Sequence, residues 1–314
     1  MPAPTTLDTM RRREGLAIAA IAGAVATWSC SNVFIKLTST DGMTTSFYRL
    51  WFALPFLWPL ALSVPSIRRG LDGQWLRASA GGGLLFGFHQ ILFFNSLKMT
   101  SVVNVSIIGA LQPALVLLVA GPMFGERSTS RSLLWSLLAV VGTALVVAGS
   151  AGAPSWSPLG DALAVVNLFA FTAYFLFSKR IRGAVGASEY VVGMTTVAAV
   201  VVAIAGLLGG HRLDQPVARD WPIFLFLALC SGTLGHVLTN WAHRYTPAFI
   251  MSIMMLATPV FAALGAHFVL EERLRIVQVV GGAVVLFSIG MVVLSTQAET
   301  AEELAESAAE TGAP

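Results

Sequence analysis

Residues 100–127 read TSVVNVSIIGALQPALVLLVAGPMFGER, and residues 246–273 read TPAFIMSIMMLATPVFAALGAHFVLEER. The two stretches align without a gap at a spacing of 146 residues. Among the identical pairs are Thr100 with Thr246, Ser106 with Ser252, Pro113 with Pro259, Glu126 with Glu272 and Arg127 with Arg273. An apolar composition alone would repeat leucines, but it would not repeat hydroxyls, a proline and a terminal Glu-Arg pair in register. The chain therefore contains an internal repeat.

The composition around this repeat is that of a membrane protein. Of the 314 residues, 56% are hydrophobic and only 11% are charged, whereas soluble domains carry about 25% charged residues. A chain with so few charges lacks the polar surface that a fold in water needs. The excess of basic residues is only three charges and is spread over short loops, so it does not indicate nucleic-acid binding.

Apolar runs near the ~20 residues that a membrane-spanning helix needs recur along nearly the whole chain. They predict an all-α integral membrane fold with ten transmembrane helices. The predicted spans are 15–36, 44–64, 78–97, 100–122, 131–150, 160–178, 188–210, 221–242, 246–270 and 274–295. In the third span, Gly83 and Gly87 have the spacing that lets a neighbouring helix approach closely.

The repeated stretches fall on the fourth and ninth spans. Five spans separate equivalent positions, so the two copies must cross the membrane in opposite senses. We therefore predict two inverted five-helix repeats around a central cavity, residues 15–150 and 151–296. A cytoplasmic segment (1–14) precedes them, and an acidic cytoplasmic tail (297–314), helical or disordered, follows. Transporters commonly use such inverted repeats to open a central site to each side in turn.

The orientation follows from lysine and arginine, which are enriched in cytoplasmic loops. With an uncleaved first span entering from the cytoplasm, twelve of these residues lie on the inner side and six on the outer side. The bias comes mostly from the first six spans. We expect both termini in the cytoplasm and the protein in the inner membrane of a bacterium.

Several short motifs resemble those of one family. Trp28-Ser29-Cys30-Ser31-Asn32 followed by Lys36 is similar to its W-G-S-N-F-x-x-x-K motif, and Arg49 opens the second span as it does there. Pro113 with Gly125-Glu126-Arg127, Gly160-Asp161, and Pro259 with Glu272-Arg273 complete the order. The chain thus resembles the drug/metabolite transporter superfamily over residues 14–296, within it the ten-span EamA-type permeases and their amino-acid exporter branch. The resemblance implies a basket of ten helices and transport of small metabolites.

Ionisable side chains at membrane depth are costly, and each one is a candidate functional group. The predicted mid-span positions contain no Asp or Glu, which argues against an antiporter for lipophilic cations. Two histidines, His89 and His236, lie in the third and eighth spans. An imidazole could bind a substrate carboxylate or carry a proton, or it could simply hydrogen-bond to a neighbouring helix.

Neutral polar and aromatic side chains complete the candidate cavity. Each polar residue could equally be an interhelical hydrogen bond, but the set indicates a polar lining for a zwitterion. The aromatic residues could form apolar walls. The full substrate-binding set is Trp28, Asn32, His89, Gln90, Asn95, Gln112, Asn167, Tyr174, His236 and Trp241.

Pro113 and Pro259 lie inside the fourth and ninth spans, where each removes an amide donor and frees the carbonyl of Gly109 or Met255. A static kink and a hinge are both consistent with this, and the symmetric placement favours a hinge. Arg49 could snorkel to the outer interface, cap a cavity mouth or hold a substrate carboxylate. Base rates favour snorkelling.

The function we expect is export of neutral or aromatic amino acids by alternating access, as facilitated diffusion. A proton-coupled drug or metabolite exporter, or an importer, with the same fold is the alternative. An intramembrane enzyme is a distant one, since no H-E-x-x-H or G-x-S-x-G motif is present. We expect no cofactor, no metal and no nucleic-acid partner, only a small-molecule substrate and the lipid bilayer. One chain supplies both repeats, so a monomer suffices, although an oligomer stays open.

Overall fold

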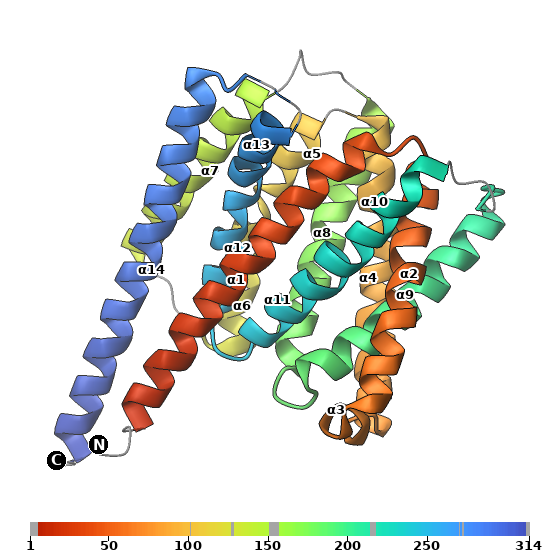
Figure 1. Ribbon diagram of the computed structural model, residues 1–314. Coiled ribbons are helices and arrows are strands. Elements are labelled where there is room, and N and C mark those ends of the chain that lie inside the picture. Colours follow the sequence, from red (N-terminus) through yellow and green to blue (C-terminus); the bar gives the residue numbers. More distant parts are fainter. Residues whose placement is uncertain are drawn as a thin grey trace.

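The computed structural model describes residues 6–311 except 101, 127, 128, 151–156, 214–217, 270 and 272. Throughout these residues the chain forms helices joined by short turns, and no β-strand occurs among them. The helices stand side by side in one bundle (Figure 1). The first helix, α1 (Thr6–Leu37), begins at the same end of the bundle at which the last, α14 (Ile276–Thr311), finishes (Figure 1). We call this the terminal end, and the opposite one the far end.

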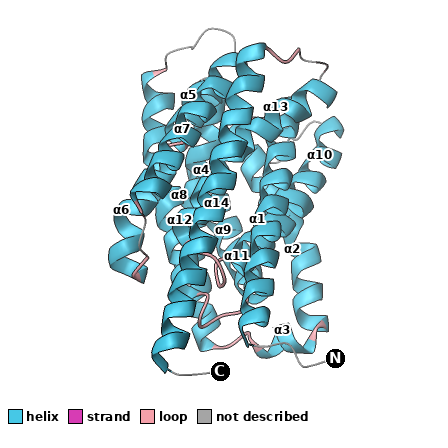
Figure 2. Cartoon of the chain, turned by 90° about the vertical axis from the view of Figure 1, so that its left-hand side faces the viewer, coloured by secondary structure: helices cyan, strands magenta, loops and turns pink. Residues whose placement is uncertain are grey.

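The first half of the chain contains seven of the helices in the described part. After α1 these are α2 (Gly42–Ser63), α3 (Pro65–Arg69), α4 (Gly73–Met99), α5 (Val102–Gly109), α6 (Gln112–Phe124) and α7 (Ser130–Ser150). Aspartates cap the N-termini of two of these helices. Asp41 accepts a hydrogen bond from the amide of Thr44 at the start of α2, and Asp72 accepts one from the amide of Trp75 at the start of α4. The short α3 lies at the terminal end (Figures 1 and 2).

The second half follows a similar order. Its elements are α8 (Pro158–Ile181), α9 (Ala187–Leu208), η1 (Ala218–Asp220), α10 (Trp221–Phe226), η2 (Leu227–Gly235), α11 (His236–Ala242), α12 (Ala248–Met254), η3 (Met255–Ala257) and α13 (Thr258–Val269), before α14. Ser157 caps α8 by accepting from the amide of Gly160. The acidic tail, predicted to be either helical or disordered, is helical as far as Thr311, because α14 continues through it.

Every predicted span coincides with helix, and eight helical segments of the described part are long and apolar enough to cross a membrane. These eight are all the predicted spans except the second and third. The corresponding helices, α2 and α4, are as long as the others. However, they carry polar residues such as Arg49, His89 and Gln90 along their length. Their crossing of the membrane stays a prediction.

The fourth and ninth spans are not single helices, contrary to the prediction of prolines inside continuous helices. The fourth is divided at Ala110 and Leu111 into α5 and α6, and the ninth is divided by η3 into α12 and α13. Pro113 and Pro259 are each the second residue of the helix after the break. Proline is tolerated there because first-turn amides have no acceptor within the helix. The breaks lie at equivalent positions of the repeat.

Small residues bring helices of the bundle close together. A Cβ atom added to Gly83 of α4 would lie 2.8 Å from the carbonyl oxygen of Met194 on α9, and one added to Gly87 would lie 3.0 Å from the side chain of Val201. The predicted close approach at these two glycines is therefore confirmed, and α9 is the neighbouring helix. Elsewhere, α14 packs along α7, and α4 also packs against α8.

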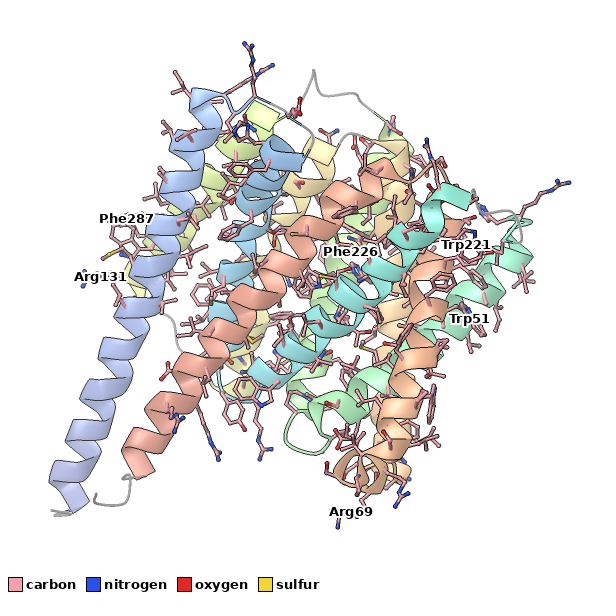
Figure 3. The ribbon with its side chains drawn as sticks, viewed as in Figure 1. Trp51, Arg69, Arg131, Trp221, Phe226 and Phe287 are labelled. Carbon is pink, nitrogen blue, oxygen red and sulfur yellow. The ribbon has the colours of Figure 1, made fainter. Side chains whose placement is uncertain are left out.

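The outer surface of the bundle is apolar. Leu118, Leu208 and Phe268 are each more than 70% exposed. Trp51 and Trp221 point outward on one side of the bundle and Phe287 on another (Figure 3). In water such a surface would drive aggregation, whereas in lipid it needs no covering.

The contact between α4 and α9 gives a stability prediction. Gly83→Ala would force α4 and α9 apart, and we expect it to lower the free energy of unfolding by about 1–3 kcal/mol. Gly290→Ala on α14 is the matched control, because nothing lies within 4 Å of the added Cβ there. That variant should be neutral or stabilise by up to about 1 kcal/mol through helix propensity. Thermal unfolding in detergent measures both, and equal midpoints would contradict the tight contact.

Candidate functional site: a central cavity

A cavity of about 290 Å³ lies inside the bundle, and both halves of the chain line it. Its polar lining comprises Trp28, Ser31, Arg49, His89, Gln90, Lys98, Ser106, Gln112, Thr143, Asn167, Ser231, His236, Ser252 and Thr258. Its apolar lining includes Ile35, Phe93, Leu97, Val105, Ala164, Leu168, Phe171, Met255 and Leu256. Lys98 is in the last turn of α4, so the cavity extends toward the far end.

Arg49 lies in this cavity, not at the lipid interface. Its side chain is only 7% exposed, and its Nη1 donates a 2.7 Å hydrogen bond to Oε1 of Gln90. The favoured prediction that Arg49 snorkels to the outer interface is therefore wrong. The place of Arg49 in its helix argues against snorkelling, because it lies seven residues, or roughly 10 Å, after the first residue of α2. A side chain that starts two turns inside a helix and points toward the neighbouring helices has no short path to water.

The two predicted histidines lie on opposite helices of the same cavity. Nδ1 of His89 is 2.7 Å from Oδ1 of Asn167, so this nitrogen carries the proton and donates. Nδ1 of His236 is 3.1 Å from the hydroxyl of Tyr174. Phe86 packs against His236 with ring centroids 4.6 Å apart. Both imidazoles are thus oriented by one polar partner each while lining the cavity.

An irregular helix holds another part of the wall. Residues Leu227–Gly235 form a π-helix, and its Ser231 carbonyl accepts a 3.2 Å hydrogen bond from Nε1 of Trp28. π-Helical segments are rare and occur frequently at functional sites. The sequence analysis did not predict this segment or Ser231, although Gly232 and Gly235 within it are a signal of an irregular helix.

Both helix breaks face the cavity. Gly109 and Gln112 line it from the break between α5 and α6, and Met255 and Thr258 line it from the break between α12 and α13. The side chain of Gln112 is buried, and its Nε2 has no hydrogen-bond partner among the described residues. An unsatisfied buried donor on a cavity wall is available to a ligand.

The remaining candidates differ in position. Tyr174 is buried and does not itself line the cavity, but it contacts the lining residues His236, His89 and Phe171. Asn95 donates to the carbonyl of Ile91 in its own helix, and Trp241 packs against Tyr245; neither is among the residues that line this cavity, and a part for them in substrate binding stays a prediction. The side chain of Asn32 lies outside the described residues.

The charged lining of the cavity is entirely basic. It contains Arg49 and Lys98 beside the two histidines, and none of its described residues is Asp or Glu. Basic groups without a carboxylate give a low-dielectric cavity a positive potential. The arrangement favours a ligand that carries negative charge on at least one group.

Toward the terminal end the two halves are held together by a cluster that we call the clamp: Glu126, Lys179, Ala248 and Phe249. Glu126 forms a 3.0 Å ion pair with Lys179 and accepts hydrogen bonds from the amides of Ala248 (2.9 Å) and Phe249 (3.3 Å). Lys179 also donates to the carbonyl of Thr246 at 2.8 Å. The clamp therefore joins the end of α6, in the first half, to α8 and α12 in the second.

His243 is buried beside the clamp, just after α11. Burial, and then the neighbouring positive charges of Lys179 and Arg182, hold the pKa of His243 well below its usual range. This imidazole is therefore neutral at physiological pH and adds no further charge to the clamp.

An apolar exterior, helices long enough to cross a bilayer and a central polar cavity define a membrane transporter. Comparison with known proteins gives the family. The EamA-like transporter family matches residues 15–148 and again residues 158–294. This chain belongs to that family, which confirms the resemblance seen in its motifs.

Several relatives are themselves named transporters. An uncharacterized transporter of Archaeoglobus fulgidus is 23% identical over 82% of this chain and 91% of its own length. The uncharacterized transporter YyaM of Bacillus subtilis is 24% identical over 65% of this chain and 68% of its own. A protein of Streptantibioticus cattleyicolor, named a probable terminal-alkyne amino-acid exporter, is 41% identical, but only over 29% of this chain and 30% of its own. One solved crystal structure has the same fold, with a TM-score of 0.75 at 18% identity, covering 90% of this chain and 97% of that one.

Filling the cavity tests whether it is the transport path. Ser106→Phe places a large ring in the cavity, and we expect flux of any transported substrate to fall at least about tenfold while the protein stays folded. Ile107→Phe is the control, because Ile107 is the next residue on the same helix, does not line the cavity and is 39% exposed. Substrate flux in proteoliposomes measures both. Equal flux in the two variants would place the path elsewhere.

Proposed function

We propose that this protein is a carrier that exports neutral or aromatic amino acids by alternating access. The observation that carries the proposal is one cavity lined by both halves of the chain, beside a clamp that joins those halves toward the terminal end. A carrier needs a central site that opens to one side while it is closed on the other. In this proposal the cavity is the central site, and the clamp is the contact that closes it on one side.

The proposed architecture is ten spans in two inverted five-helix repeats, residues 15–150 and 151–296. Two observations support it. The same family matches each half of the chain. The breaks before Pro113 and Pro259 occur at equivalent positions and line the same cavity, which suits a hinge in each half.

The proposed orientation places both termini in the cytoplasm of a bacterium and the protein in its inner membrane, following the distribution of basic residues. With the terminal end inside, the clamp is cytoplasmic and the cavity extends toward the outer side. With that orientation, we propose that this conformation is outward-facing, the state from which an exporter has released its substrate.

Two observations support the substrate class. The cavity combines basic and neutral polar groups with apolar walls, which suits a carboxylate joined to an apolar side chain. The protein that is 41% identical over part of this chain is named an amino-acid exporter.

Coupling to protons is the second candidate mechanism. Without a cavity carboxylate among the described lining residues, we propose facilitated diffusion. The alternative rests on His89 and His236, because both imidazoles line the cavity and a histidine can exchange a proton near neutral pH.

Flux measurements test the function directly. Purified protein in proteoliposomes should carry particular neutral or aromatic amino acids with saturable kinetics, at the same rate with and without an imposed pH gradient. A rate that collapses when the gradient is removed would favour histidine-mediated coupling. Absence of flux for the whole amino-acid panel, with folded protein, would overturn the substrate class and leave the family assignment intact.

The clamp gives a separate prediction for alternating access. Glu126→Gln removes the negative charge that pairs with Lys179 and weakens the hydrogen bonds from Ala248 and Phe249. We expect amide hydrogen exchange in residues 247–254 to quicken by about tenfold or more, since bonds to charged groups contribute about 1.5–3 kcal/mol. Mass spectrometry of that peptide measures it.

Asp72→Asn is the control for this experiment, because Asp72 caps α4 and contacts neither the clamp nor α12. It should leave exchange in residues 247–254 unchanged. If Glu126→Gln also leaves that exchange unchanged, the clamp does not hold α12 closed against α6.

A further inference from the structure

Resting on the proposed function, we propose that Arg49 is the residue that binds the carboxylate of the transported molecule, and that Gln90 holds it in place for that purpose. The first observation is the charge of Arg49. Arg49 is a permanent cation that is 7% exposed, and the structure gives it one hydrogen-bond partner, the neutral amide of Gln90. Its Nε has no partner among the described residues.

No described carboxylate neutralises this guanidinium. None lines the cavity. The two buried or half-buried aspartates toward the far end have other partners. Asp161 accepts from Thr100 and Asn104, and Asp220 accepts from the amides of Ser39 and Thr40. A buried cation without a counter-ion is costly, so its presence on a cavity wall indicates that the counter-ion arrives with the ligand.

The surroundings of Arg49 position it without neutralising it. The guanidinium carbon lies 5.7 Å from the centre of the Phe94 ring, and Gln90 fixes the Nη1 side. Gly232 of the π-helix lies beside Nε, since a Cβ there would lie 3.6 Å from it, and Nε is buried without a partner among the described residues. A planar guanidinium that is held at Nη1 and keeps other N–H groups unpaired can bind a carboxylate with paired hydrogen bonds.

The rest of the lining fits the same ligand. Lys98 adds a second positive charge in the last turn of α4, where an anion would enter from the far end. Gln112 offers a second unpartnered donor. Phe93, Phe171 and Leu168 provide an apolar wall for a side chain. The cavity thus selects an organic carboxylate with an apolar substituent over an amine that lacks the acid group.

The alternative is that Arg49 only ties α2 to α4 through Gln90. Gln90→Glu separates the two roles, because it keeps the size of the side chain and converts the hydrogen bond into an ion pair. If Arg49 were structural, this variant would strengthen the tie and keep transport. If Arg49 binds the substrate, the new carboxylate occupies its place. We expect phenylalanine flux in proteoliposomes to fall on the order of 10- to 100-fold, with an unchanged or higher thermal midpoint.

Binding measurements supply an independent arm. Stabilisation of the purified protein against heat would be compared for phenylalanine, phenylacetate, phenylalaninamide and phenethylamine. The two carboxylates should stabilise the native protein and the two amines should not. Arg49→Gln and Gln90→Glu should each remove the preference, while Arg49→Lys should retain part of it. Arg77→Gln, at an exposed position of α4, is the control and should behave like the unchanged protein.

The outcomes separate this inference from the proposed function. Absence of phenylalanine flux together with stabilisation by phenylacetate, lost in Gln90→Glu, would reject amino-acid export and support the role of Arg49. Transport that persists in Gln90→Glu, stabilisation by the amines instead of the carboxylates, or stabilisation by neither carboxylate would each overturn it.

Discussion

The hydrocarbon of a bilayer offers no hydrogen bonds, so each polar group that enters it must find a partner inside the protein or face a cavity. This constraint explains which side chains lie on the outside of the bundle and which lie inside it. Leucines and phenylalanines cover the outside of the bundle, while Arg49, the two cavity histidines and Gln112 line one internal cavity. It also fits where the helices are irregular, because both proline-marked breaks and the π-helix contribute residues to the cavity lining.

The internal repeat turns this cavity into a site with two sides. Helices from each half contribute to the lining, and the same family matches each half. The clamp adds asymmetry, because Glu126 joins the two halves toward the terminal end while the cavity extends toward the other. A central site shared by both halves is what a carrier requires. An uncompensated arginine in that site directs the proposal toward substrates that bring their own negative charge.

Some features followed from the sequence because they depend on local composition or on a pattern repeated along the chain. Low charge and recurring apolar runs determined a helical membrane protein. The paired Thr, Ser, Pro and Glu-Arg positions revealed the repeat. Gly83 and Gly87 indicated close helix packing, and α9 proved to be the partner. His89, Gln90, Gln112, Asn167, Trp28 and His236 were selected because polar or amphipathic groups within apolar runs need a purpose, and all six line the cavity.

Only the tertiary structure decided the rest, because these features depend on which residues face one another across the bundle. The general tendency of arginine to snorkel could not show that Arg49 hydrogen-bonds to Gln90, 41 residues away, inside the bundle. Asn95 and Trp241 are polar or aromatic like the cavity residues but do not line the cavity, and a shift of one or two residues along a helix is enough to make that difference because each residue rotates the side chain by about 100°. The clamp joins residues about 50 and 120 positions apart along the chain. The sequence determined which groups had to avoid lipid, and the packing of the helices determined which of them met.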